Sequence, residues 1–329
     1  LIDNPAVADA IGGSGASFEF PTSASYLSVG DDSDLDLVGP LSMSCWFKCD
    51  DVTHAGHSSL NRYYLVEKNA RVYGLILVGT EIKGVLDGTT EFPATGVTVE
   101  VGRWYHVMMS YDKANVNMYV DGVLRSTTAH TAAVPISTYS LMIGEHFIGQ
   151  ISQVRIHNRA LSADEVRASY NGQAVGYEYV GAKQDELVTG WTNHGGYGFD
   201  GGFVSSGTNI TEADNDTSIG IAYSSVSLVA GKKYRAKFTI GGTAGDTNFQ
   251  SGTTNTIGDA NLQDLTAGGA FDFDFVATSG HTHIGFRTLA GTSDFTVSNF
   301  SLVQIGCVAE YLPSGINATQ WVDTSGNNL

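Results

Sequence analysis

The sequence is poor in cysteine, proline, basic residues and long apolar runs, and each shortage excludes a class of protein. Its 329 residues include 17 Lys and Arg against 34 Asp and Glu, a formal net charge of −17. Nucleic acids and anionic membrane surfaces attract positive charge, so neither is expected as a partner. No stretch reaches the roughly 18 consecutive apolar residues of a membrane-spanning helix, so membrane insertion is not expected either.

The three cysteines do not have the pattern of a disulfide-stabilised secreted domain. Cys45 and Cys49 lie on one predicted strand, where a rise of about 3.3 Å per residue keeps them too far apart to bond. Cys307 is distant from both in the sequence. The sequence therefore predicts three free, buried thiols.

Glycine and short alternating segments are abundant. Forty glycines against six prolines are typical of many short strands joined by tight turns. Segments 17–20, 43–48 and 271–275 alternate between two residue classes, and Asp121-Gly122 after another such segment indicates a hairpin. Because the chain is too long for one ordinary domain, we predict an all-β protein of two antiparallel β-sandwich (jelly-roll) domains in tandem.

One helix signal interrupts this pattern. Ser162 can cap a helix N-terminus, and Glu165, three residues later, has the spacing of a capping box. Asn171-Gly172 supplies residues that tolerate the left-handed conformation of a helix end. We predict a short helix at 162–169 that closes the first domain. The expected boundaries are an N-terminal segment at 1–15, a first sandwich at 16–172, a second sandwich at 177–305 and a C-terminal connector at 306–329.

The first block resembles a laminin-G-like or concanavalin-A-like jelly-roll domain. The resemblance covers nearly all of residues 16–172 and rests on the order FEF, YLSVG, LSMSCWFK, YLVEK, GRWYHVMMSYD, VNMYVDG, LMIG and FIGQISQVRIHNRALSADEV. It implies that the last strand returns beside the first and that a short helix closes the domain.

The second block resembles the β-sandwich of carbohydrate-binding modules more loosely, through LVTGWTN, VAGKKYRAKFTIGG, FDFDFVATSG, IGFR and FTVSNFSLVQ. The C-terminal text CVAEYLPSGINATQWVDTSGNNL resembles a connector of tailed-phage fibres and other phage virion proteins. The two resemblances together imply a protein that presents glycan-binding folds on a surface.

We therefore expect a non-enzymatic virion structural protein, a tail fibre or a capsid decoration, that attaches to a host surface. Its expected partners are a cell-surface glycan and other virion subunits or copies of itself in a homo-oligomer. The alternatives are a secreted bacterial adhesin and a carbohydrate-binding accessory module of a polysaccharide-degrading enzyme. A glycanase is disfavoured because no clustered E-x-D-x-x-E run is present, and a glycosidase needs two carboxyl groups within about 5–10 Å.

Candidate glycan-binding residues concentrate in the glycine-rich stretch WTNHGGYGFDGGF. Glycines cannot bury aromatic rings, so these rings are expected either exposed to a glycan or neighbouring subunit, or folded down as plugs. The candidates are Trp191, Asn193, Tyr197, Phe199 and Phe203 from this stretch. Trp46 of the first block is a further candidate, although the resemblance favours its packing.

No cofactor is required, but calcium is a candidate ligand because many laminin-G-like domains bind it at the sandwich rim. Asp31, Asp32 and Asp34 in VGDDSDLDL provide the hard oxygen ligands that calcium prefers. The alternative is that these residues only form turns, for which Asp, Ser and Gly are equally suited.

Overall fold

The computed structural model describes residues 6–9, 16–53, 61–171, 182, 185–215, 219–243, 245–288, 293–312, 321–325, 327 and 329. The chain folds into two compact units. The first comprises Leu1–Gly176, Val180–Gln184 and Gly306–Leu329, and the second comprises Tyr177–Tyr179 and Asp185–Ile305. The second unit is therefore inserted into the chain of the first. Of the short connector expected at 171–176, residues 172–176 lie outside the described residues.

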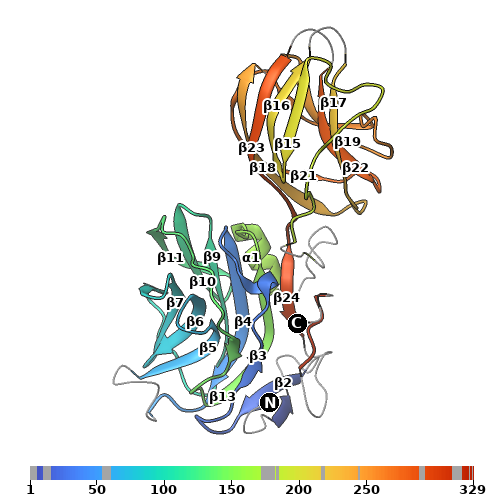
Figure 1. Ribbon diagram of the computed structural model, residues 1–329. Helices are drawn as coiled ribbons and strands as arrows, with labels where there is room; N and C mark the ends of the chain where they lie inside the picture. The colour runs from blue at the N-terminus through green and yellow to red at the C-terminus, as the bar shows by residue number, and fades with distance from the viewer. Residues whose placement is uncertain are drawn as a thin grey trace. The chain divides into compact units, whose positions relative to one another are not determined.

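Each unit consists of antiparallel sheets, which confirms the prediction of an all-β fold (Figure 1). The eight-stranded sheet of the first unit has the order β1-β2-β13-β4-β9-β10-β11, and β24 also pairs with β13. Its strands are β1 (Ala6–Asp9), β2 (Ala16–Phe20), β4 (Leu41–Cys49), β9 (Trp104–Tyr111), β10 (Asn115–Val120), β11 (Val123–Ala129), β13 (Gly149–His157) and β24 (Cys307–Tyr311).

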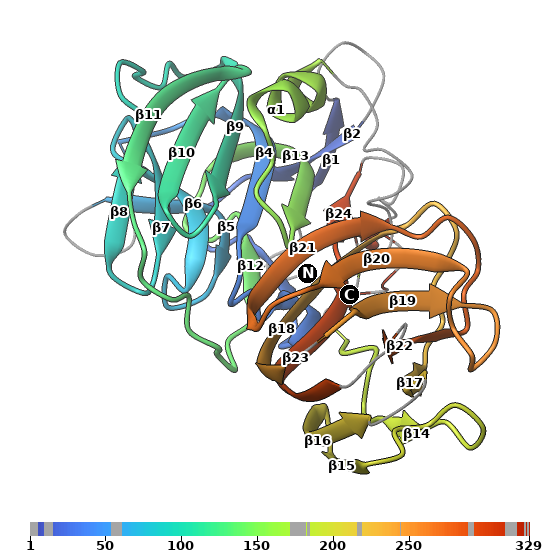
Figure 2. The same ribbon diagram turned by 90° about the horizontal axis from the view of Figure 1, so that it is seen from above.

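A six-stranded sheet with the order β3-β12-β5-β6-β7-β8 forms the other layer of the first unit (Figure 2). Its strands are β3 (Leu27–Val29), β5 (Arg62–Lys68), β6 (Tyr73–Val78), β7 (Glu81–Leu86), β8 (Thr90–Pro93) and β12 (Leu141–Ile143). Apolar side chains from both sheets, among them Phe47, Leu75 and Met109, form one buried core. All three cysteines are buried and free, as predicted.

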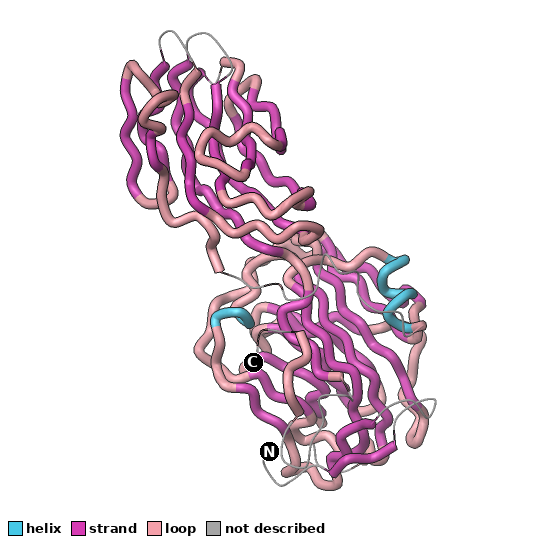
Figure 3. The backbone as a smooth tube through the Cα atoms, turned by 90° about the vertical axis from the view of Figure 1, so that its right-hand side faces the viewer, coloured by secondary structure: helices cyan, strands magenta, loops and turns pink. Residues whose placement is uncertain are grey.

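Helix is rare in the described part of the chain, as Figure 3 shows in cyan. The 3-10 helix η2 (Ser33–Leu35) and the α-helix α1 (Ala163–Tyr170) both belong to the first unit. Ser162 caps α1 and forms the predicted capping box with Glu165. Val166 of α1 packs with Met108 and Tyr119 on the outer face of the eight-stranded sheet. Among the described residues, no helix has the length and apolar composition needed to cross a membrane.

The tail expected as a connector, 306–329, instead contributes β24 to the first unit. β2 pairs with β13 along Gly149–Ile151, and β24 pairs with the same edge of β13 along Val154–His157. An ion pair of 2.8 Å joins Arg155 to Glu310, and Trp321 packs 5.0 Å from Phe18 between ring centroids. The tail therefore completes the sheet.

The second unit contains two five-stranded sheets, with the orders β14-β17-β22-β19-β20 and β15-β16-β23-β18-β21. The strands of the first are β14 (Thr192–Asn193), β17 (Ile221–Ser225), β19 (Thr247–Gly252), β20 (Ala260–Leu265) and β22 (His283–Thr288). Those of the second are β15 (Gly202–Ser206), β16 (Asn209–Asn215), β18 (Lys233–Thr243), β21 (Gly269–Val276) and β23 (Ser293–Gln304). Phenylalanines including Phe238, Phe249 and Phe286 form their shared core.

Candidate functional site

The sheet that contains β17, β22 and β19 has one face on the core and one face outward. Ala222, Phe249 and Phe286 are paired across these strands and belong to the core. Because side chains alternate along a strand, their sequence neighbours point outward. We call this side the outer face of the second unit; its residues on these strands include Ile221, Tyr223, Asn248, Gln250, His283, Gly285 and Arg287.

A row of aromatic rings lies along the outer face. The centroid of Tyr197 is 5.5 Å from that of His194, His194 is 6.1 Å from Tyr223, and Tyr223 is 5.5 Å from His283. Burial lowers the pKa of His283 below its usual value, which favours its neutral ring near pH 7. Flat rings with polar edges are surfaces on which a sugar ring can stack.

Tyr197 stands at the tip of a loop that its neighbours hold in place. The backbone N–H groups of Gly196 and Tyr197 both donate to His194 Nδ1 at 3.0 Å. Asn193 Oδ1 accepts from the Phe199 N–H at 2.8 Å, which closes the loop. The ring of Tyr197 itself remains exposed. Asn193, predicted as a ligand contact, therefore positions the loop that presents Tyr197.

Beside the aromatic row lies an open hollow of about 290 Å³. It is lined by Tyr197, Ile219, Ile221, Thr256, Ile257 and Arg287. These residues combine an apolar floor with a phenol, a hydroxyl and a guanidinium group. This combination of apolar surface and a few polar groups is typical of small-molecule sites.

Several polar atoms at this face have no hydrogen-bond partner within the protein. They are Gln250 Oε1, Asn248 Oδ1 and Arg287 Nε. Both amide side chains are only 7% exposed, and a buried polar atom without a partner costs about 1–3 kcal/mol. At Gly258, with φ of +106°, a Cβ atom would lie 2.5 Å from Arg287 Nη1 and 3.5 Å from Gln250 Oε1. The guanidinium group of Arg287 and the amide group of Gln250 thus both lie beside this glycine.

Two of the predicted aromatic residues are core residues instead of exposed ones, and a third packs against the core. Trp191 and Phe199 are 7% and 5% exposed, and Phe203 packs against the same core. The Trp191 ring lies 4.8 Å from that of Phe300, and its Nε1 donates to the Thr208 carbonyl oxygen at 3.0 Å. An indole whose N–H group is hydrogen-bonded can be buried, so Trp191 is folded down into the core and is not exposed to a ligand. Of the predicted set, only Tyr197 reaches the hollow.

Trp46, the candidate from the first unit, is half-buried on the eight-stranded sheet. Its ring stacks on Tyr170 of α1 at 5.5 Å and lies 5.2 Å from His106. Burial, with a smaller contribution from the charge of Arg155, lowers the pKa of His106 to about 3. Trp46 thus packs between the sheet and the closing helix.

Two carboxylates predicted as calcium ligands have partners within the first unit. Asp31 Oδ1 lies 2.8 Å from Lys68 Nζ, whose side chain is fully buried. Asp32 Oδ1 accepts from the Asp34 N–H at 2.8 Å and so caps η2, while Asp34 is itself 8% exposed. No group of three His, Cys, Asp or Glu side chains suited to a metal was found in the described part of the chain. Calcium binding stays a prediction.

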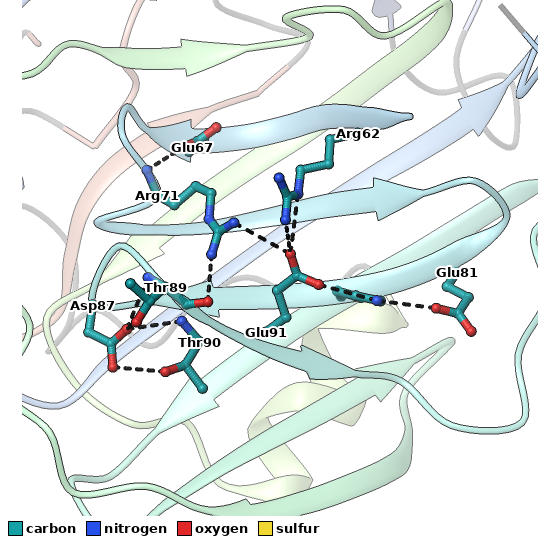
Figure 4. Close-up of polar contacts among 9 residues, drawn as sticks. Arg62, Glu67, Arg71, Glu81, Asp87, Thr89, Thr90 and Glu91 are labelled. Atoms are coloured by element: carbon teal, nitrogen blue, oxygen red, sulfur yellow. Dashed lines mark hydrogen bonds and ion pairs between the residues drawn. The ribbon is translucent and has the colours of Figure 1, made fainter. Parts of the chain in front are cut away.

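A second polar cluster lies on the six-stranded sheet of the first unit (Figure 4). Arg62 Nη2 and Arg71 Nη1 both approach Glu91 Oε1, at 2.7 and 3.5 Å, and Lys83 Nζ lies 3.2 Å from Oε2. Burial raises the pKa of Glu91, but hydrogen bonds from Arg62 and Lys83 outweigh it and leave the pKa lowered. Because the three cations share this carboxylate, the cluster is an ion-pair network that cross-links the strands.

Glu67 lies near this network and is almost fully buried, at 2% exposure. Desolvation raises the pKa of its carboxyl group to about 8, although the Arg71 N–H donates to Oε1 at 2.5 Å. Glu67 is thus largely protonated near neutral pH. A buried acid with a shifted pKa can mark a functional site, but Glu67 does not line the hollow described above, so the outer face of the second unit is the better candidate.

The sequence alone did not predict Tyr223, Gln250 or Arg287 as residues of a site. Alternation was available as a signal, because Asn248 and Gln250 flank the apolar Phe249. Their meeting with Arg287 depends on the pairing of β19 with β22, where Asn248 faces Arg287 across the ladder. That register joins residues about forty positions apart, and no local pattern specifies it.

Comparison with protein families identifies the first unit. Residues 21–167 match the model described as the concanavalin A-like lectin/glucanases superfamily. This match confirms a concanavalin A-like jelly-roll domain in this part of the chain. No curated protein matches the chain.

Solved structures that resemble the chain include domain 4 of AbnA, a GH43 extracellular arabinanase from Geobacillus stearothermophilus, in complex with arabinotriose. It is 21% identical, with a TM-score of 0.39, over 51% of this chain and 80% of that one. The binding domain of Paraclostridial Mosquitocidal Protein 1 is 11% identical, with a TM-score of 0.45, over 69% of this chain and 58% of that one. The CBM40 module of the Ruminococcus gnavus IT-sialidase is 14% identical, with a TM-score of 0.35, over 47% of this chain and 96% of that one.

Proposed function

We propose that this protein binds a glycan, without catalysis, on the outer face of its second unit. The observation that carries the proposal is a hollow of about 290 Å³, lined by apolar side chains and by Arg287, at the end of an aromatic row. Sugar rings present apolar faces for the aromatic rings and hydroxyl groups for polar side chains. In the lining of the hollow, the phenol of Tyr197, the hydroxyl of Thr256 and the guanidinium group of Arg287 would supply these polar contacts.

The lining of the hollow supports binding without hydrolysis. Glycoside hydrolysis uses two carboxyl groups on either side of the scissile bond, about 5–10 Å apart. None of the six residues that line the hollow is an acid. The first unit, with its match to a superfamily of lectins and glucanases, supports the same class of ligand.

Replacement of Tyr223 by alanine is expected to weaken glycan binding about tenfold, because a stacked ring contributes roughly 1 kcal/mol or more to the binding free energy. Tyr197→Ala should have a similar effect, since its exposed ring ends the aromatic row. The measurement is isothermal calorimetry with an oligosaccharide selected on a glycan array.

Tyr139→Ala is the matched control, because this tyrosine is 51% exposed and belongs to the first unit. Its affinity should equal that of the wild type. Equal affinities for all variants, with the melting temperatures unchanged, would place the site elsewhere and reject the proposal.

For the biological setting, we propose a virion surface protein, a tail fibre or a capsid decoration, attached to a host glycan. Support comes from the resemblance of 306–329 to phage connectors, although β24 belongs to the sheet of the first unit. Repeated copies would add avidity to weak individual sites. The secreted adhesin and the accessory module share the ligand class and differ in assembly.

Light scattering of the native protein separates these settings. The virion proposal predicts a stable trimer or a larger symmetric species, because appendages are assemblies of identical subunits. Measurements with calcium and with chelator would also reveal whether the ion controls assembly. A monomer of 34.8 kDa under both conditions would contradict a self-assembling appendage and favour the accessory module.

A further inference from the structure

We infer that the glycan bound at the outer face carries a carboxylate group, which Arg287 recognises. This inference rests on the proposed function and specifies its ligand. It starts from the position of Arg287 in the lining of the hollow, where its Nε atom is buried and has no partner. A guanidinium group offers five donors in a planar fork that matches the two oxygens of a carboxylate.

Within the part of the chain that the structure describes, Arg287 has no carboxylate partner, unlike Arg235 and Lys237 of the same unit. Arg235 Nε lies 2.7 Å from Asp274, and Lys237 Nζ lies 3.1 Å from Asp272. Among the described residues, no acid forms an ion pair with Arg287. In a chain with twice as many acids as bases, an arginine without an internal counter-charge is suited to an external one.

The nearby acids are held by other groups. Asp264 Oδ1 accepts from Asn248 Nδ2 and, at 2.7 Å, from Asn261 Nδ2. Asp259 Oδ2 accepts from the N–H and the hydroxyl of Thr253, at 2.7 and 2.8 Å. Both carboxylates therefore have partners other than Arg287, and its guanidinium group keeps its positive charge available to the hollow.

The remaining groups define the rest of the ligand. Thr256 supplies a hydroxyl group to the lining of the hollow, and Tyr197 supplies an aromatic ring with a phenol group. An acidic sugar unites these features, with its carboxylate on Arg287, a hydroxyl on Thr256 and its ring face on Tyr197.

The test compares each acidic oligosaccharide with its carboxyl-reduced counterpart. Suitable probes are trigalacturonic acid and sialyllactose, measured by calorimetry with the full chain. We expect at least tenfold tighter binding of one acidic probe. Arg287→Gln should abolish that preference while leaving binding to the reduced probe, and Arg287→Lys should retain part of it because only the charge is conserved. Arg167→Gln, on exposed helix α1, should change nothing.

The outcomes separate the inference from the proposed function. Equal binding of acidic and reduced probes, or an acidic preference that survives in Arg287→Gln, would overturn the inference and leave glycan binding intact. Binding of neutral oligosaccharides alone would overturn it too. If neither acidic nor neutral members of a broad array bind, the proposed function fails together with the inference. Melting temperatures of the variants show whether each one is folded.

Discussion

Replacement of Trp191 by alanine is expected to destabilise the second unit by about 3–5 kcal/mol, the usual cost of truncating a buried aromatic residue. The ring lies 5.1 Å from Phe286 and 4.8 Å from Phe300. Its loss would leave a cavity in the core and remove the donor to the Thr208 carbonyl oxygen. Such an effect is a large fraction of the stability of a single domain.

Urea titration with hydrogen exchange of peptides from β22 and β23 measures this effect in the full chain. Trp191→Phe should cost less, because it keeps a ring in the core. Tyr197→Ala serves as the comparison from the same stretch and should leave stability unchanged, since its ring is exposed. A Trp191→Ala protein of normal stability with impaired glycan binding would mean that Trp191 is a binding platform after all.

Replacement of Glu67 by glutamine is expected to remove a pH dependence from the stability of the first unit. The carboxyl pKa rises from 4.5 to about 8 on folding because of desolvation. Between these values the folded state binds a proton that the unfolded chain has lost, so stability falls as pH rises. This contribution is complete below about pH 4.5 and has been lost above pH 8, with a size on the order of 3–5 kcal/mol.

The test is the difference in unfolding free energy between Glu67→Gln and wild type from pH 5 to pH 9. The variant should gain relative stability as the pH rises and reach a plateau above pH 8. Glutamine keeps an oxygen that can accept from the Arg71 N–H. The repulsion within a chain of net charge −17 affects the variant and the wild type alike, so it cancels in the difference between their unfolding free energies. Parallel stability curves would show that Glu67 titrates normally.

Local patterns predicted the elements that depend on neighbours in sequence. The capping box of Ser162 and Glu165 is present in α1, because both hydrogen bonds form within one turn. The alternation in 271–275 produced β21, whose Phe side chains pack against the core while Asp272 and Asp274 pair with basic residues of β18. The cap follows from the three-residue spacing of Ser162 and Glu165, and the two faces of β21 follow from the two-residue period of a strand.

Features that depend on distant pairing could not be predicted. β24 pairs with β13, which lies about 150 positions earlier in the sequence, and no pattern in the five residues of β24 predicts this partner. The burial of Trp191 depends on Phe286 and Phe300, which lie on two other strands. The hollow likewise requires the pairing of two strands, β17 and β22, and the approach of residues outside them. Composition indicated aromatic residues suited to a glycan, but only the strand register decided which of them face outward.

Hydrogen exchange of the full chain with and without a bound oligosaccharide tests the central claim most directly. A glycan on the outer face of the second unit should slow exchange in four segments, 194–199, 221–225, 254–258 and 283–287, and leave the six-stranded sheet of the first unit unchanged. Protection confined to the first unit, or no protection with any bound oligosaccharide, would contradict glycan recognition by the second unit.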